Sequence, residues 1–139
     1  MQRSTGKRKA IDMGQMEQVL AEFGQDIGLT ALEPSAQGHV QLRLASGALL
    51  GASTQGEEVV LHYAEPVERG AAQLAFVAMR MAGRAETAAD PVQVGVRTTP
   101  RGEWLVAGTR LPLDRLSARE VHRLGTYLQS WLAQVRQNH

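Results

Sequence analysis

Residues 70–83, GAAQLAFVAMRMAG, constrain the fold more than any other stretch of the sequence. Ala, Leu and Met favour a helix, and nothing between Ala71 and Ala82 breaks one. The polar residues within those limits are Gln73 and Arg80, which lie seven apart and share one narrow stripe of the helix. A helix that is apolar around most of its circumference must be covered on more than one side. A chain of 139 residues has little material with which to cover it.

Length and composition indicate one globular domain. A chain of this size buries about two-thirds of its unfolded surface. Its 43% hydrophobic and 21% charged residues are typical of a soluble protein. The absence of cysteine excludes disulfides and thiolate chemistry and is compatible with a reducing cytoplasm. No apolar stretch approaches the roughly 18 to 20 residues that span a bilayer, so we expect no membrane partner.

The basic charge is concentrated at the N-terminus. Four basic residues precede the first acidic residue, Asp12, namely Arg3, Lys7, Arg8 and Lys9. The rest of the chain has 11 basic residues and 14 acidic ones. We predict a basic flexible tail over residues 1–12 and a single α+β domain over 13–139. A cloning remnant or a true start at Met13 or Met16 would also explain the tail. Four charges without a clustered basic face on the body are a weak nucleic-acid signal, so we expect no nucleic-acid partner.

Hydrophobic periodicity predicts three helices. Asp12 and Gln15 form a capping box that opens the first helix, Gly28 is its expected terminator, and 30–38 reads as a loop. Pro66 suits the start of the middle helix, predicted over 67–83 and followed by a loop over 84–90. Ser117 and Glu120 form a second capping box, which opens the last helix. The apolar positions of the outer two helices are Met16, Val19, Leu20, Phe23 and Ile27, then Val121, Leu124, Leu128, Trp131, Leu132 and Val135.

Alternation of apolar and polar residues predicts five strands between these helices. The first three, over 39–47, 48–54 and 57–66, form a meander joined by turns at 46–47 and 55–56. The last two, over 91–99 and 103–113, form a hairpin whose turn is 100–102. The order is helix, three strands, helix, two strands, helix. We therefore predict an α+β fold with an antiparallel twisted sheet packed against helices.

The residues that would carry catalysis or metal binding do not form a recognised pattern. The four histidines, at 39, 62, 122 and 139, show no metal-ligand spacing, and there is no cysteine to join them. No phosphate-binding glycine loop and no GxSxG serine setting occurs. Glu57 and Glu58 are adjacent in a strand and so point to opposite faces, which suits no paired acid and base. We expect no catalytic residue, no metal, no cofactor and no enzymatic activity.

The middle helix predicts a homodimer. Its small residues, with Leu74, suit close packing on the sheet, while Phe76, Val77, Met79 and Met81 have no evident partner within the chain. A second copy of the helix across a two-fold axis is the simplest cover, and a loop or the last helix is the alternative. The predicted dimer interface also includes the neighbouring strand and consists of Leu74, Phe76, Val77, Met81, Val92, Val94 and Val96.

The sequence resembles the class I type III secretion chaperones, the family of the Tir and YopE chaperones. The matching stretches are MEQVLAEFGQDIGL, the meander from HVQLRLASG to EEVVLHYAEP, the Ala/Met-rich middle helix and WLVAGTRLPLDRLSAREVHRLGTYLQSWL. Within the last, RLPLDRL leads straight into a capped amphipathic helix, as in the family. The resemblance covers about residues 13–135. The family is commonly strongly acidic, and this chain after its tail carries only about −3.

This resemblance implies a homodimeric, non-enzymatic, cytoplasmic chaperone of a bacterium with a type III secretion system. Such a protein binds the non-globular N-terminal segment of a secreted effector and keeps it soluble and export-competent. The implied effector-binding residues are Met16, Leu20, Phe23, Leu42, Leu44, Leu49 and Leu61, for which ordinary core positions are the alternative. A small-ligand-binding or enzymatic α+β domain is the competing function, and a basic-tailed nucleic-acid-binding dimer is a third.

Overall fold

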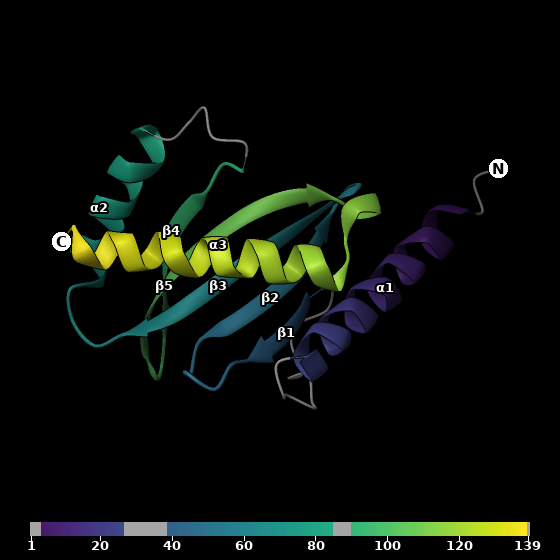
Figure 1. The fold of residues 1–139 in the computed structure, drawn as a ribbon, viewed down its shortest axis with the longest axis horizontal. Helices are drawn as coiled ribbons and strands as arrows, with labels where there is room; N and C mark the ends of the chain where they lie inside the picture. The colour runs from purple at the N-terminus through teal and green to yellow at the C-terminus, as the bar shows by residue number, and fades with distance from the viewer. Residues whose placement is uncertain (1–3, 27–38, 85–89, 139) are drawn as a thin grey trace.

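The computed structural model describes residues 4–26, 39–84 and 90–138, with the backbone alone for 4–13 and 84. Figure 1 shows the arrangement of the elements. In chain order they are α1 (Ser4–Asp26), β1 (His39–Arg43), β2 (Leu49–Gln55), β3 (Glu58–Val67), α2 (Ala71–Arg84), β4 (Gln93–Thr99), β5 (Gly102–Pro112), the 3-10 helix η1 (Leu113–Arg115) and α3 (Ala118–Gln137). The predicted order of helices and strands is confirmed.

The five strands form one antiparallel sheet in the order β1-β2-β3-β5-β4. The first three strands are a meander, and β5 lies between β3 and β4. The chain therefore leaves β3, passes through α2 and enters the sheet again at its far edge before β5 fills the gap. This connection places α2 beside β4 and β5. The predicted α+β fold with an antiparallel sheet is confirmed.

The three helices cover one face of the sheet, which we call the inner face. In Figure 1, α3 lies across the sheet, with α1 toward the β1 end and α2 toward the β4 end. Alternate strand residues bury on the inner face, as the predicted alternation requires: Val59, Leu61 and Tyr63 are buried, whereas Val60 and His62 are half-buried on the other side. The core thus lies between the sheet and the helices. We call the uncovered side the outer face.

Two predicted helix starts were wrong. Helix α1 begins at Ser4, eight residues before the capping box at Asp12; the segment between them contains no proline, and the helix accommodates Gly6. Strand β3 continues to Val67, and α2 begins at Ala71 after Gly70, whose φ is 75°. Pro66 is tolerated in β3 because the pairing of β2 ends at Ala64, which leaves this part of β3 paired with β5 alone.

Local signals placed the other boundaries well. The Ser117 hydroxyl accepts a hydrogen bond of 3.1 Å from the backbone N–H of Glu120, so the predicted cap of α3 is confirmed. The β4–β5 turn lies at residues 100–101, where the Thr99 hydroxyl accepts from the Arg101 N–H and donates to the Gly102 carbonyl. The predicted terminator Gly28 and the loop over 30–38 lie outside the described residues, as do residues 85–89 of the second predicted loop.

Candidate functional surfaces

The residues that the resemblance assigned to effector binding do not form one surface. Five of them are 8% exposed or less and belong to the core, namely Met16, Leu20, Phe23, Leu42 and Leu61. Leu44 and Leu49 are half-buried, but Leu44 packs toward the core and Leu49 lies on the outer face. Burial favours the core alternative for these five, although Phe23 also lines a groove between α1 and α3, and their assignment to effector binding stays a prediction. Their helical and alternating spacing reflects the packing of α1 on β1 and β2.

The second predicted set does leave an apolar surface, formed by α2 and β4. Phe76 is 59% exposed, Met79 56% and Val96 39%, which are large fractions for such side chains. Half-buried residues surround them: Val77, Met81, Val92 and Val94. We call these seven residues the α2–β4 surface. Leu74 is the exception among the predicted interface residues, because it is buried on the side of α2 that packs onto the sheet.

Strand β4 adds a second property to this surface. It is an edge strand, paired with β5 on one side, and each of its residues is exposed or half-exposed. An edge strand presents unpaired backbone groups that a further strand can pair with. The α2–β4 surface thus combines uncovered apolar side chains with a backbone edge, both of which favour association with another chain.

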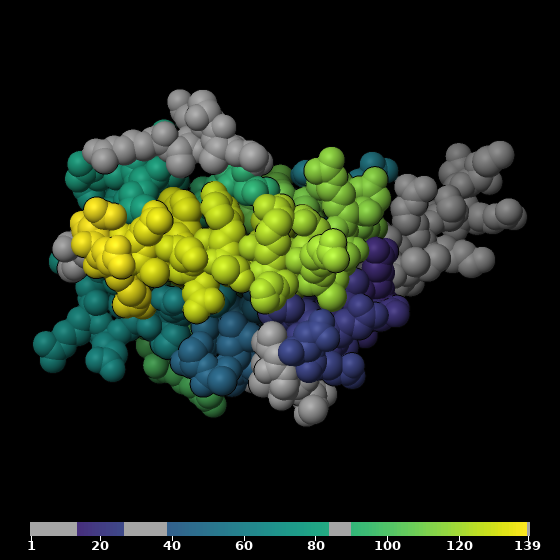
Figure 2. Space-filling view, viewed as in Figure 1, coloured from purple at the N-terminus to yellow at the C-terminus, as the bar shows by residue number. Residues whose placement is uncertain are grey.

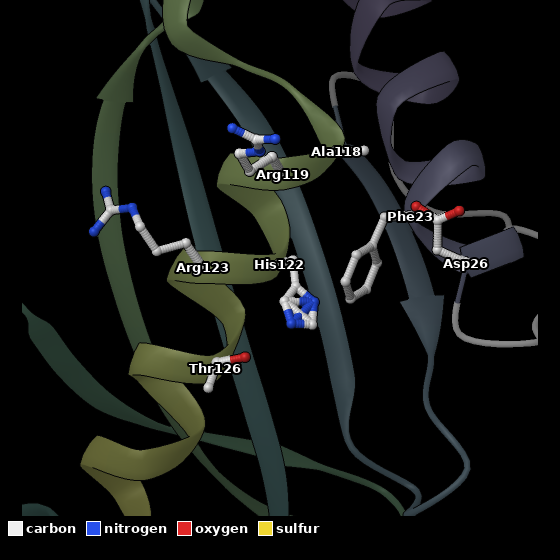
Figure 3. A pocket seen from close by; sticks show the side chains of 7 residues that line it. All are labelled: Phe23, Asp26, Ala118, Arg119, His122, Arg123 and Thr126. Atoms are coloured by element: carbon white, nitrogen blue, oxygen red, sulfur yellow. The ribbon is translucent and has the colours of Figure 1, made fainter.

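A groove lies between the C-terminal end of α1 and the N-terminal half of α3. It has a volume of about 650 Å³ and is lined by Phe23, Asp26, Ala118, Arg119, His122, Arg123 and Thr126, which we call the α1–α3 groove. In Figure 2 the purple residues of α1 border the yellow-green half of α3. Figure 3 shows Phe23 and His122 facing each other across the groove, and their ring centroids are 6.1 Å apart in an edge-to-face arrangement.

Arg123 lines this groove but is held by carboxylates on its other side. Its Nε and Nη2 donate to the two carboxylate oxygens of Glu120 at 2.9 and 3.0 Å, and its Nη1 donates to Asp90 Oδ2 at 3.0 Å. These hydrogen bonds lower the pKa of the Glu120 carboxyl and raise that of the guanidinium. Figure 3 shows the Arg123 side chain directed away from Phe23. Its charge is therefore largely compensated within the chain.

The same arginine belongs to an anchor that fixes the chain where it enters β4. Besides the Arg123–Asp90 ion pair, the Tyr127 hydroxyl donates to the Asp90 carbonyl at 2.8 Å. The Thr109 hydroxyl donates to the Pro91 carbonyl at 2.9 Å. Residues from α3 and β5 thus hold the two residues that precede Val92. The anchor sets the position of the α2–β4 surface relative to α3.

The outer face of the sheet has a smaller hollow of about 330 Å³ over β3, β5 and β4. Its lining includes His62, Arg97 and Gly108. The His62 ring lies over Gly51 of β2, where a Cβ would come within 2.7 Å of His62 Nε2, so this glycine leaves space for the ring. The ring also approaches His39, with centroids 6.3 Å apart. Burial, followed by the charges of Arg97 and His39, lowers the pKa of His62 to about 4.

The described residues contain no metal-ligand cluster, and the polar side chains of the α1–α3 groove are open to solvent. No group of three or more histidines, aspartates or glutamates in this part of the chain could hold a metal ion. In the α1–α3 groove the polar side chains Asp26, Arg119 and His122 are exposed. They do not form the network of shielded, mutually oriented groups that general acid–base chemistry needs. Among the described helices, none is both long and apolar enough to cross a membrane.

Sequence comparison finds no matching family model and no matching curated protein. The fold is similar to that of several solved chains. A chain of the HopA1–SchA chaperone–effector complex gives a TM-score of 0.58 at 18% identity, covering 90% of this chain and 97% of that one. A chain from the Yersinia pestis type III secretion chaperone SycH in complex with a fragment of YscM2 gives 0.54 at 16%, covering 86% and 98%. A chain of the ExsC–ExsE complex gives 0.57 at 14%, covering 86% and 89%. The chain therefore has the fold of these three solved chains.

Proposed function

We propose that this chain is a homodimeric chaperone of type III secretion, which binds the non-globular N-terminal segment of a secreted effector and keeps it soluble and export-competent. The observation that carries the proposal is the fold. It is similar over 86–90% of the chain to chains of a chaperone–effector complex, of a type III secretion chaperone complex and of the ExsC–ExsE complex. The chain acts as a binding protein and not as an enzyme.

The dimer forms through the α2–β4 surface. Exposed Phe76, Met79 and Val96 on one protomer meet the same residues of a second copy, because a two-fold axis makes a surface complementary to itself. Large apolar side chains gathered at one site are a common feature of protein interfaces. Leu74 supports this interface from the core side of α2 and does not contact the partner.

The client is an unfolded segment, and the chain offers it shallow, open surfaces. Extended segments gain affinity from main-chain hydrogen bonds at a sheet edge and selectivity from apolar anchors in separate hollows. The α1–α3 groove and the hollow on the outer face are two such places. The competing function, small-ligand binding or catalysis, requires polar groups that converge in an enclosed site. The polar side chains of the α1–α3 groove are exposed, which favours the chaperone.

Co-expression with N-terminal segments of secreted proteins from the same genome tests the proposal, beginning with the genes adjacent to this one. We expect one such segment to co-purify with the dimer and to be protease-resistant in the complex but unfolded alone, as circular dichroism would show. Calorimetry should give a negative heat-capacity change with an ordering cost. Failure of every N-terminal segment to bind, or binding of folded effector domains alone, would contradict the proposal.

A further inference from the structure

We infer that the α1–α3 groove receives a part of the client segment in which apolar side chains stand next to acidic ones. The inference rests on the proposed function, since it names the chemistry of the client at one site. Phe23 of α1 and Ala118 of α3 both line the groove and give it an apolar part. Its volume of about 650 Å³ is in the range of about 300 to 1,000 Å³ in which small ligands and side chains are bound.

The charge of the groove selects the acidic neighbour. Arg119, His122 and Thr126 lie at positions i, i+3 and i+7 of α3 and so share one face of the helix. Within the described part of the chain, Arg119 forms no ion pair, whereas Arg123 is held by Glu120 and Asp90. The groove therefore presents a cation, Arg119, that no carboxylate of the described residues neutralises.

Arg119 lies at the positive end of the α3 dipole, which also favours an acidic partner. It lies in the first turn of α3, where the helix dipole disfavours a positive charge and favours a negative one. An acidic residue of the client would pair with Arg119 and also meet the positive end of the helix. Asp26 on the α1 side of the groove repels a carboxylate, so the acidic residue of the client faces α3. The apolar residue of the client then lies against Phe23 and Ala118. The groove thus binds the client in one orientation.

Two fluorescein-labelled peptides test the charge preference. Both carry the same leucines and valines in a Gly/Ser background, with glutamates beside them in one and lysines in the other. By fluorescence anisotropy at low salt, we expect the glutamate peptide to bind the intact protein roughly three- to fivefold more tightly, the effect that exposed ion pairs support. Added salt should reduce the difference. Arg119→Glu should reverse the order of the two peptides.

Arg101→Glu is the matched control. It makes the same change in net charge at an exposed residue of the β4–β5 turn, and it should leave the preference for glutamate intact. Equal affinities of the two peptides for the wild type would overturn the inference. So would an unchanged preference in Arg119→Glu, because Arg119 would then not be the cation that the peptide meets.

A second readout locates the peptide. The chain contains no cysteine, so Thr126→Cys gives a single site for a bimane fluorophore in the groove, and Gln55→Cys gives one at the exposed end of β2. A tryptophan added to the glutamate peptide should quench the first label and not the second. Equal quenching of both labels, or none at the first, would overturn the inference.

If an effector segment still binds Arg119→Glu with unchanged affinity, the assignment of the client to the α1–α3 groove is wrong and the proposed function stands. If no effector segment binds any variant, the proposed function fails.

Discussion

His62 is a histidine that the fold keeps neutral, and this gives a prediction for the pH dependence of stability. Its pKa falls from the ordinary value of 6.5 to about 4 because the ring is buried beside Arg97 and His39. Between these two values the unfolded chain binds the proton more tightly than the folded chain. The stability due to neutral His62 is therefore complete above pH 6.5 and is lost as the pH falls toward 4.

We expect the free energy of unfolding of the wild type to fall by up to about 3 kcal/mol relative to His62→Gln over this pH range, at about 1.4 kcal/mol per pKa unit. Urea denaturation of both proteins at a series of pH values measures the difference. Other groups titrate in both proteins and cancel in the comparison. If the free energy of unfolding depended on pH in the same way in the wild type and in His62→Gln, the burial of His62 would not lower its pKa.

Two contacts between aromatic rings, His39–His62 and Phe23–His122, could not be predicted from the sequence. His39 and His62 belong to β1 and β3, and their rings meet because β2 contributes Gly51 between them. Phe23 and His122 are far apart in the chain and meet because α1 packs beside α3. Such contacts depend on tertiary packing. The i, i+3, i+7 spacing of Arg119, His122 and Thr126 is the signal in the sequence that places these three residues on one face of a helix.

Element boundaries were predictable where a local interaction sets them. Ser117 caps α3 through a hydrogen bond to a residue three positions away, and a pattern of that length is visible in the sequence. The inward residues of α2 and the alternation in β3 followed from periodicity in the same way. Periodicity alone could not distinguish a core face from a client-binding face, so it left both open for Met16 and Leu20, whose burial favours the core.

Helix α2 provides the prediction at the scale of an element. Phe76→Glu places a charge in the middle of the α2–β4 surface, and burying it there would leave it unpaired. We expect the dissociation constant of the dimer to rise at least roughly 30-fold, as when one dominant interface contact of about 2 kcal/mol is lost. Sedimentation velocity over a range of concentrations measures this.

Gln129→Glu adds the same charge to the exposed side of α3, and we expect it to leave the dimer unchanged. Circular dichroism should show both variants to be folded, since Phe76 contributes little to the core. A wild type that sediments as a monomer would contradict the proposed interface, as would a Phe76→Glu variant with undiminished dimer affinity.

Helices α1 and α2, which contribute to the two surfaces, pack toward opposite edges of the sheet. In Figure 1, α2 and β4 are at one end of the sheet and α1 is at the other, with α3 extending between them. A dimer that joins the α2–β4 surfaces would leave both α1–α3 grooves accessible, one on each protomer. Arg123 connects the two regions, because it lines the groove and also holds Asp90 at the entry to β4. A long client segment could therefore contact each protomer without competing with dimer formation.

The basic N-terminus is the remaining part of the whole molecule to which this arrangement assigns no role. Residues 2–9 include no apolar side chain that could anchor this segment in a core, and the first fully buried side chain described in α1 is that of Met16. Deleting residues 1–10 should therefore leave the thermal midpoint nearly unchanged, because a terminal segment without an apolar anchor contributes little to stability. Met16→Ala should lower it clearly, since truncating a buried side chain of this size costs about 2 to 5 kcal/mol. Differential scanning calorimetry of the two variants beside the wild type makes the comparison. A large drop on deletion would mean that the basic segment docks on the mildly acidic remainder of the chain, and raising the salt concentration should then reduce the difference.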